Sequence, residues 1–444
     1  MANTPNSALL AERAQQALEL AVAAGADDAR VHASRSREVE YTGRDGSLET
    51  VKEATARSLS LDLWVGGRFS SHSTTSMDPT RLRAFVDEAV ALTRALQPDP
   101  HRTLPDPALY AGRTDADLEL IQPDVDTLDS AKREAWLGEL DAGLHADERV
   151  ISASGYVGST LSESAVVSTN GLEGSYGGTQ LWVGGSATVR DAGEGRPEGS
   201  WYVGVRQLDD LPPLTDVASK ALEQATVRIG SQKGPTTKTL MVLDPRTASR
   251  MVSRLLGALT ARGVYQGRSF YAGKVGEKLF SELLTITDEP HLPRGLGSRP
   301  YDGEGIASAP RTMIGAGVVE QLYVDTYYGN KAEMTPNGGS RSNVVVASGS
   351  DKDFNGLLYD IGEAIYVSGW LGGNADGTTG DFSFGVRGHH IHKGQVGPAI
   401  GEMNVTGNYI DLFSKLVAVG NDPWPFRSTM VPSMVFEGVD FSGA

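Results

Sequence analysis

Residues 59–65 read Leu-Ser-Leu-Asp-Leu-Trp-Val, an alternation of apolar and polar side chains that ends at the glycine pair Gly66 and Gly67. A period of two is typical of a β-strand with one buried face, and the glycines predict a tight turn. Two further strand-like stretches precede it, Ala29–Tyr41 and Gly46–Val51. Amphipathic helical patterns flank the group at Ser7–Ala24 and Thr80–Leu96. The order helix, strands, helix predicts an α/β unit.

The same order returns after a proline-rich connection between residues 98 and 123. Helical patterns cover Asp126–His145 and Leu214–Ile229. The strand-like stretches between them are Arg149–Tyr156, Ser164–Thr169, Thr179–Val189 and Gly199–Arg206. We therefore predict that residues 1–230 form an N-terminal α/β domain that contains a duplicated helix–strands–helix unit.

A polar segment without periodicity, Ser231–Lys238, predicts a domain boundary. It is followed by a strand at Thr239–Leu243 and a helix at Pro245–Ala261. Short strands and glycine turns then dominate, with one short helix at Asp411–Val419. The 53 glycines of the chain agree with many tight turns. We predict an α+β subunit of two domains, whose second domain, residues 235–444, is mostly antiparallel β.

Composition limits the classes of function. The chain of 444 residues carries 40 basic and 56 acidic side chains, a net charge of −16 that disfavours non-specific binding of nucleic acid. No apolar run approaches the ~20 residues that span a bilayer. The sequence has no cysteine, which excludes disulfides and thiolate ligands. The polar stretch Met1–Ser7 resembles no secretory leader, so we expect a cytoplasmic protein.

Chemistry-bearing residues are sparse. No H-E-x-x-H, G-x-S-x-G or P-loop motif occurs. The segment His389–His392 is the one dense group of histidines. In a strand, His390 and His392 would share a face and could reach one metal ion, with Asp381 or Glu402 as a third ligand; a solvated strand end is the plainer interpretation. Asp302 and Glu304 could serve acid–base chemistry or could cap a turn.

Several stretches occur in an order that resembles the TldD/PmbA family, once described as modulators of DNA gyrase. They are Ser269–Gly276, Phe280–Pro290, Gly297–Gly305 (GSRPYDGEG), Gly380–Gly388 (GDFSFGVRG), Glu402–Asn408 (EMNVTGN), Val419–Asp422 and Pro432–Gly438. The resemblance covers residues 235 to 444 and extends more loosely into the N-terminal half. It implies a two-domain subunit with a β-rich C-terminal part.

The resemblance also implies a site that this sequence lacks. TldD members of the family carry zinc on a helical H-E-x-x-x-H, with a cysteine as a further ligand and the glutamate as the base. Here Val252 and Gly257 stand at the two histidine positions and Ser253 at the glutamate position. Valine and glycine side chains offer zinc no lone pair, and serine is no base at neutral pH. The chain is therefore identified as a PmbA/TldE-type member without catalytic or metal residues of its own.

We expect a non-catalytic subunit that completes a peptide-degrading chamber with a TldD-like zinc subunit, and a homodimer when that partner is absent. Unfolded peptide is the expected substrate, and zinc is expected in the partner. Two alternatives remain open. One is a self-sufficient metal-dependent hydrolase that uses the His389–His392 cluster, and the other is a binding module that regulates a large partner such as DNA gyrase.

Overall fold

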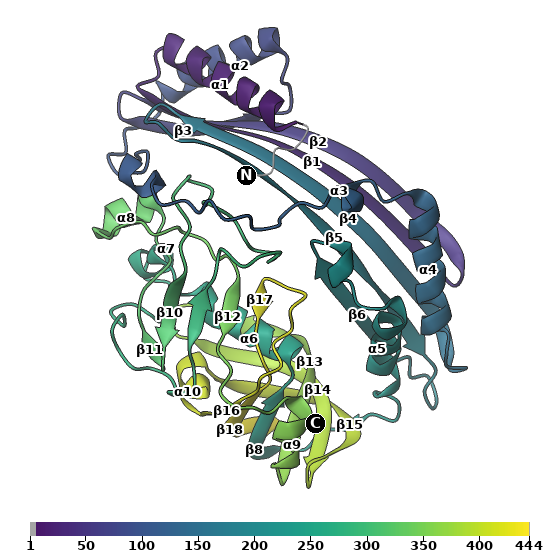
Figure 1. The fold of residues 1–444 in the computed structure, drawn as a ribbon. Coiled ribbons are helices and arrows are strands. Elements are labelled where there is room, and N and C mark those ends of the chain that lie inside the picture. The colour runs from purple at the N-terminus through teal and green to yellow at the C-terminus, as the bar shows by residue number, and fades with distance from the viewer. Residues whose placement is uncertain (1–5, 444) are drawn as a thin grey trace.

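A computed structural model describes residues 6–443, which form a curved N-terminal sheet and a C-terminal half under its concave side (Figure 1). Residues 1–5, on which the expectation of a cytoplasmic protein partly rests, lie outside the described residues. The N-terminal elements are α1 (Ser7–Ala23), β1 (Asp28–Arg44), β2 (Ser47–Val65), β3 (Arg68–Thr74), α2 (Pro79–Thr93), α3 (Pro123–Asp126), α4 (Ser130–Leu144), β4 (Val150–Ser168), β5 (Glu173–Val189), β6 (Glu198–Val205) and α5 (Leu214–Thr226).

Strands β1 to β6 form one antiparallel sheet in the order β3-β2-β1-β4-β5-β6. Each half of the sheet comes from one helix–strands–helix unit, and the first strands of the two units pair at the centre, with Ala33 opposite Ala165. The strands of the first unit lie between α1 and α2 along the chain, and those of the second lie between α4 and α5. The predicted duplication is therefore confirmed.

The alternation that begins at Leu59 decides which face of the sheet is buried. Leu59, Leu61 and Leu63 are each 0% exposed and pack with the apolar sides of α1 and α2. The second unit repeats this arrangement, because α4 and α5 cover β4, β5 and β6 on the same face. The opposite, concave face is left without helices and faces the C-terminal half (Figure 1).

Several strand boundaries were predicted wrongly. The strands predicted at Gly46–Val51 and from residue 57 are one strand, β2, and β3 was not predicted as a strand of its own. The stretches predicted at Arg149–Tyr156 and Ser164–Thr169 are likewise one strand, β4. Glycine and serine between them have weak strand propensity, but pairing with β1 on one side and β5 on the other holds β4 extended throughout.

The C-terminal half contains two sheets. Its elements are β7 (Gln232–Lys233), β8 (Thr237–Leu243), α6 (Pro245–Gly257), α7 (Ala261–Tyr265), β9 (Ile286–Asp288), β10 (Arg311–Gly315), β11 (Val318–Val319), α8 (Thr326–Ala332), β12 (Val344–Val346), α9 (Phe354–Tyr359), β13 (Glu363–Ala375), β14 (Asp381–His392), β15 (Gln395–Asn408), α10 (Tyr409–Ser414), β16 (Leu416–Val419), β17 (Thr429–Met430) and β18 (Met434–Ser442). The larger sheet closes on itself because β18 pairs with both β8 and β15.

Helix α6 lies between the two C-terminal sheets, since it contacts β8 and β13 of the larger sheet and β17 of the smaller one. Asp244 caps its first turn by accepting a hydrogen bond from the Thr247 amide at 2.7 Å. Its apolar side, which includes Met251 and Leu255, is buried in the main C-terminal core. The opposite side of α6 remains partly exposed.

The mostly antiparallel character of this half is confirmed, since only β8–β13, β12–β17 and β15–β7 pair in parallel among the named strands of residues 6–443. The helix predicted at Asp411–Val419 is wrong in part: α10 ends at Ser414, and β16 follows it as a strand paired with β18. The predicted helix Pro245–Ala261 ends early, at Gly257. Within the described part of the chain, no helix is both long enough and apolar enough to cross a bilayer.

Candidate functional site

The three positions that the family resemblance places at a zinc motif lie on different sides of α6. Val252 is 0% exposed and packs into the core, whereas Gly257 is exposed, and a Cβ at that position would meet no other atom within 4 Å. Ser253 is half-buried, and its backbone oxygen accepts a hydrogen bond from Arg341 Nη1 at 3.1 Å. Five residues turn a helix through ~500°, so positions 252 and 257 point ~140° apart.

These residues do not fit a zinc ion. Valine and glycine side chains carry no donor atom, and a serine hydroxyl beside them is neither a ligand of ordinary zinc sites nor a base. Among residues 6–443, no group of three or more His, Asp or Glu side chains has a geometry that could hold a metal ion. Helix α6 therefore supplies no donor set for a metal-dependent step.

The histidine cluster lies at the end of β14. His390 and His392 do share a face there, as predicted, and both contact Glu363 on the neighbouring strand: His390 Nε2 is 3.2 Å from Glu363 Oε2, and His392 Nδ1 contacts Oε1. His389 points to the other face, where its ring stacks on Tyr366 at 5.8 Å between centroids.

Neither expected third ligand joins these histidines. Asp381 begins β14 at its far end, where it accepts hydrogen bonds from Asn408 and Thr379. Glu402 lies 3.8 Å from Lys233 Nζ. The structure thus brings together two exposed imidazoles and one exposed carboxylate, which is typical of a solvated ion-pair network.

The carboxylates of Asp302 and Glu304 hold backbone in place. Asp302 accepts hydrogen bonds from the amides of Glu304 and Ile306, at 2.9 and 3.0 Å. Glu304 accepts from the amide and hydroxyl of Thr326, at 2.8 and 2.9 Å. Burial raises the pKa of both carboxyl groups. The hydrogen bonds describe a turn cap, the simpler of the two interpretations.

The concave face of the N-terminal sheet holds a cavity of about 470 Å³. Its wall is rich in small polar side chains, which are Ser34, Ser36, Ser58, Thr160, Ser162 and Ser164. Tyr176 and Arg206 close it toward the C-terminal half. The Tyr176 ring contacts Tyr301 at 5.1 Å, and Arg206 donates to the backbone oxygens of Gly295 and Leu296. Hydroxyl groups both donate and accept hydrogen bonds, so this wall can bind the backbone of an extended peptide whatever its side chains are.

Aromatic rings continue the concave face beyond this cavity. Trp182 lies over Gly204 on β6, since a Cβ at that glycine would meet the indole at 2.7 Å. Tyr202 covers Gly184 on β5 in the same way and is 36% exposed. Tyr156 contacts Tyr202 and donates a hydrogen bond to Glu40 at 3.1 Å. Flat rings over glycine form an apolar platform suited to side chains of a bound peptide.

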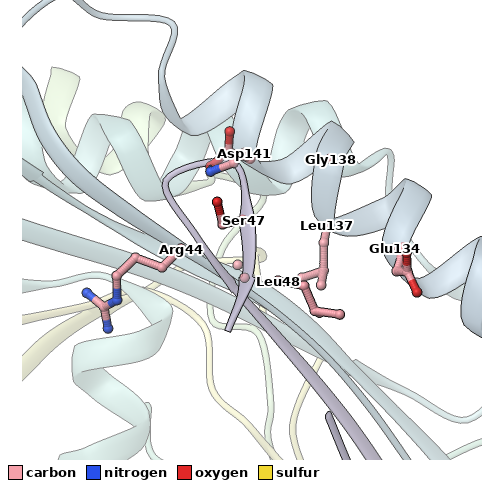
Figure 2. A pocket seen from close by; sticks show the side chains of 10 residues that line it. Arg44, Ser47, Leu48, Glu134, Leu137, Gly138 and Asp141 are labelled. Carbon is pink, nitrogen blue, oxygen red and sulfur yellow. The ribbon is translucent and has the colours of Figure 1, made fainter. Parts of the chain in front are cut away.

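A second, smaller pocket of about 170 Å³ lies outside the sheet, between the β1–β2 turn and α4 (Figure 2). Asp141 on α4 fastens this turn by accepting a hydrogen bond from the Gly46 amide at 2.9 Å. Leu48 and Leu137 line the gap from opposite sides (Figure 2). The lining contains carboxylates but no imidazole or activated nucleophile, so it offers no catalytic set.

One group of charged residues was missed at the sequence level. Arg246, Arg250 and Arg254 follow one another at intervals of four residues on α6, and no acidic residue occurs between Pro245 and Gly257. Within a predicted helix, this spacing places all three on one side. The signal was therefore present in the sequence.

Three family models match the chain. They are the PmbA/TldA metallopeptidase domain 1 at residues 28–93, the central domain at residues 123–229 and the C-terminal domain at residues 236–443. Together with the fold, these matches define a chain of the metallopeptidase class. The chain belongs to the PmbA/TldD family.

Related sequences align with almost the whole length of this chain. The metalloprotease PmbA of Escherichia coli O157:H7 is 28% identical and covers 93% of this chain and 92% of its own. The metalloprotease PmbA homologue of Haemophilus influenzae is 26% identical and covers 96% and 94%. The predicted family is thus confirmed, and the function of the chain is related to proteolysis.

Solved structures show the same fold. A candidate modulator of DNA gyrase from Bacteroides thetaiotaomicron has a TM-score of 0.94 and 35% identity, with 98% of each chain covered. TldE from Thermococcus kodakarensis has a TM-score of 0.84 over 97% of this chain and 100% of its own. Because the sequence identity is only 18%, the TldE comparison supports the fold alone.

Proposed function

We propose that this chain is a non-catalytic, TldE-like subunit that holds unfolded peptide for a TldD-type zinc subunit, which cleaves it. The observation that carries the proposal is the composition of α6, where Val252, Ser253 and Gly257 stand at the positions that the family resemblance assigns to two zinc ligands and a base. A hydrolytic zinc site needs several protein ligands, an open water position and a base. A full-length family fold without these groups favours a binding role.

The concave face supports the peptide part of the proposal. Its hydroxyl-lined cavity of about 470 Å³ offers hydrogen bonds to a backbone, and the rings of Trp182 and Tyr202 offer apolar contact to side chains. Both features accept an extended chain of variable sequence. A subunit with this face contributes half of a chamber wall without any catalytic group.

The edge of the sheet supports an assembly of two subunits. Strand β3 covers β2 only from Leu59 onward, so within the described residues the outer backbone edge of residues 47–57 is unpaired. Every one of these residues is exposed, including Leu48 and Val51 at 49% each. A long free edge with apolar side chains favours pairing with another chain. We propose a homodimer alone, a heterodimer with a TldD-type partner, and a cytoplasmic location for both.

A metal-dependent hydrolase at His390 and His392 is the second candidate, because both imidazoles contact the Glu363 carboxylate, so that three possible metal-binding groups lie together. Its weakness is the missing third ligand. Zinc would have to gain a further donor from outside this group.

The decisive assay follows cleavage of a fluorogenic unstructured peptide by the purified chain, by a TldD-type partner, and by both together. We expect no cleavage by this chain alone, and chelator-sensitive cleavage that rises when the two are mixed. A partner with one zinc-ligand histidine replaced is the control for contaminating peptidase. Chelator-sensitive cleavage by this chain alone would overturn the proposal in favour of the second candidate.

A further inference from the structure

Three arginines along α6, together with three from other segments that lie within electrostatic reach of Arg246, form a group that we name the arginine cluster. They are Arg246, Arg250 and Arg254 on α6, Arg228 after α5, Arg387 on β14 and Arg427 in the segment before β17. Elsewhere the chain is strongly acidic, with a net charge of −16. The cluster is therefore a local reversal of the overall charge.

Most of the cluster has no polar partner in the protein. Within residues 6–443, Arg250, Arg254, Arg387 and Arg427 make no hydrogen bond or ion pair, and Arg387 Nε is buried without a partner. Arg246 donates to Gln224 at 2.7 Å and lies 3.6 Å from Asp244 Oδ2. That carboxylate is already occupied, because it caps α6 and accepts from the Tyr366 hydroxyl at 2.8 Å.

This arrangement opposes the stability of the fold. Like charges four residues apart repel each other on a helix, and Arg246 stands in the first turn, where the helix dipole disfavours a cation. Burial lowers the pKa of Arg228 to about 10, and the charges of Arg387 and Arg246 contribute to the shift. Glu198 and Asp244 offset only part of this charge, and a group of cations with so few carboxylates beside it is typical of a binding site for an anion.

Aromatic rings hold two of the guanidinium groups in fixed positions. Arg246 lies 4.4 Å from the ring centroid of Trp201, and Arg427 lies 4.9 Å from that of Trp424. The two indoles contact each other at 5.2 Å. Stacking uses the flat face of the guanidinium group, so its N–H groups can still donate, except the one that Arg246 already donates to Gln224. Stacking also reduces the entropy lost when a carboxylate binds.

The spacing on α6 identifies the form of the ligand. Four helical residues rise ~6.0 Å, so Arg246, Arg250 and Arg254 follow each other at about that interval. In an extended peptide, every second side chain lies on the same side, and two residues advance ~6.6 Å. An extended peptide with carboxylates at alternate positions therefore matches the three arginines one to one.

We propose that the arginine cluster binds acidic, extended peptide segments, with carboxylates at every second residue paired to Arg246, Arg250 and Arg254. The proposal rests on the peptide-holding function and adds a preference for acidic sequence. Longer polyanions such as nucleic acids are disfavoured, because the remaining surface repels them. Arginine pairs carboxylates by two parallel hydrogen bonds, which adds to the selectivity.

Direct binding tests the proposal without any cleavage. Fluorescence anisotropy compares three labelled peptides on the full chain: Gly-Glu repeats with three alternate glutamates, the same peptide with glutamine, and one with its three glutamates adjacent. We expect the alternating acidic peptide to bind most tightly. Arg250→Gln with Arg254→Gln should weaken its binding about fivefold to tenfold, and added salt should weaken it as well.

The control variant replaces Arg81 and Arg83 by glutamine, two exposed arginines on α2 at the far side of the sheet; we expect it to bind like the unaltered chain. Equal affinity for the glutamate and glutamine peptides would overturn the inference and leave peptide holding intact. Equal affinity for the adjacent-glutamate peptide, an equal loss in the control, or tighter binding of single-stranded DNA would also contradict it. If neither peptide binds, the proposed function fails together with the inference.

Discussion

Strand β1 and helix α6 both carry several arginines, but the two groups have opposite surroundings. Each arginine of β1 has a carboxylate within hydrogen-bond distance. Three of these pairs are partly buried: Arg30–Asp62 at 2.7 Å, Arg35–Glu163 at 2.8 Å and Arg37–Asp126 at 2.8 Å. The fourth, Arg44–Glu49, is exposed. On α6, only Arg246 approaches a carboxylate of the described residues, at 3.6 Å, and that group has other partners.

The difference separates arginines that are paired with a carboxylate within the folded chain from arginines that remain without such a partner. Within the sheet, charges partly removed from water are stabilised by their neighbours, as partly buried ions require. Around α6 the described part of the chain supplies few such neighbours, although carboxylates are abundant in the sequence. We infer that the arginines of β1 stabilise the fold and that those of α6 bind a ligand. The following variants test this contrast.

The largest effect is expected at Arg35. Replacing Arg35 by leucine removes the cation beside Glu163, and the Glu163 side chain is 0% exposed. Glu163 keeps the hydrogen bonds that it accepts from Asn6, but a buried carboxylate that loses its cation still costs about 3 kcal/mol in the free energy of unfolding. Urea denaturation measures it, and Arg35→Leu combined with Glu163→Leu should recover most of the loss. A double variant as unstable as the single one would contradict the pairing.

The reverse result is expected at Arg387. Its Nε is buried without a partner, and burial lowers its pKa, with a further contribution from Arg246. Arg387→Met removes this charge and keeps an apolar side chain of similar length, so the free energy of unfolding should stay constant or rise by up to about 1 kcal/mol. A loss as large as that of Arg35→Leu would place Arg387 among the structural arginines.

The pH dependence of stability tests the charge of the arginine cluster through His389, which lies within electrostatic reach of Arg228. Burial lowers the pKa of His389 below its ordinary value of 6.5; the hydrogen bond to Gly397 opposes the shift and Arg228 adds to it. The unfolded chain therefore takes up this proton at higher pH than the folded one, and stability is lost as pH falls below about 6.5.

His389→Gln removes this titration. The decrease in melting temperature between pH 7.5 and pH 5.5 should be smaller in the variant than in the unaltered chain, whatever the difference in absolute stability. An identical decrease in both proteins would show that the pKa of His389 does not differ between the folded and unfolded states.

The smallest effect is expected at Arg250. Arg250→Gln relieves repulsion from Arg246 and Arg254 on α6, and because Arg250 lies in the middle of the helix the helix dipole does not oppose this gain. The free energy of unfolding should rise by about 0.3 kcal/mol at low salt. Because the repulsion is between partly exposed charges, the gain should vanish at high salt. A gain that persists in ~1 M salt would point to packing rather than to charge.

Much of the fold follows from patterns in the sequence. The alternation from Leu59 and the two helix–strands–helix units predicted the sheet, because one-sided burial leaves a period of two. Strand lengths escaped prediction where long-range pairing overrides local propensity, as in the centre of β4, which contains Gly158, Ser159 and Ser162. The absence of zinc donors at Val252 and Gly257, the positions that the family resemblance assigns to histidines, is readable from the sequence. The contact of His390 with Glu363 could not be predicted, because it depends on which strand lies beside β14.

The arginine cluster shows the limit of such predictions. The row on α6 is readable from the sequence, but Arg228, Arg387 and Arg427 join it only through the tertiary fold. Whether an arginine is paired also depends on neighbours far along the chain: Arg35 and Glu163 are 128 residues apart.

Metal analysis of the chain, purified without chelator, tests most directly whether this subunit is non-catalytic. Because Val252, Ser253 and Gly257 offer zinc no donor set, we predict far less than one zinc ion per chain. The result that would contradict this is one tightly held zinc per chain that disappears in the His390→Ala, His392→Ala variant.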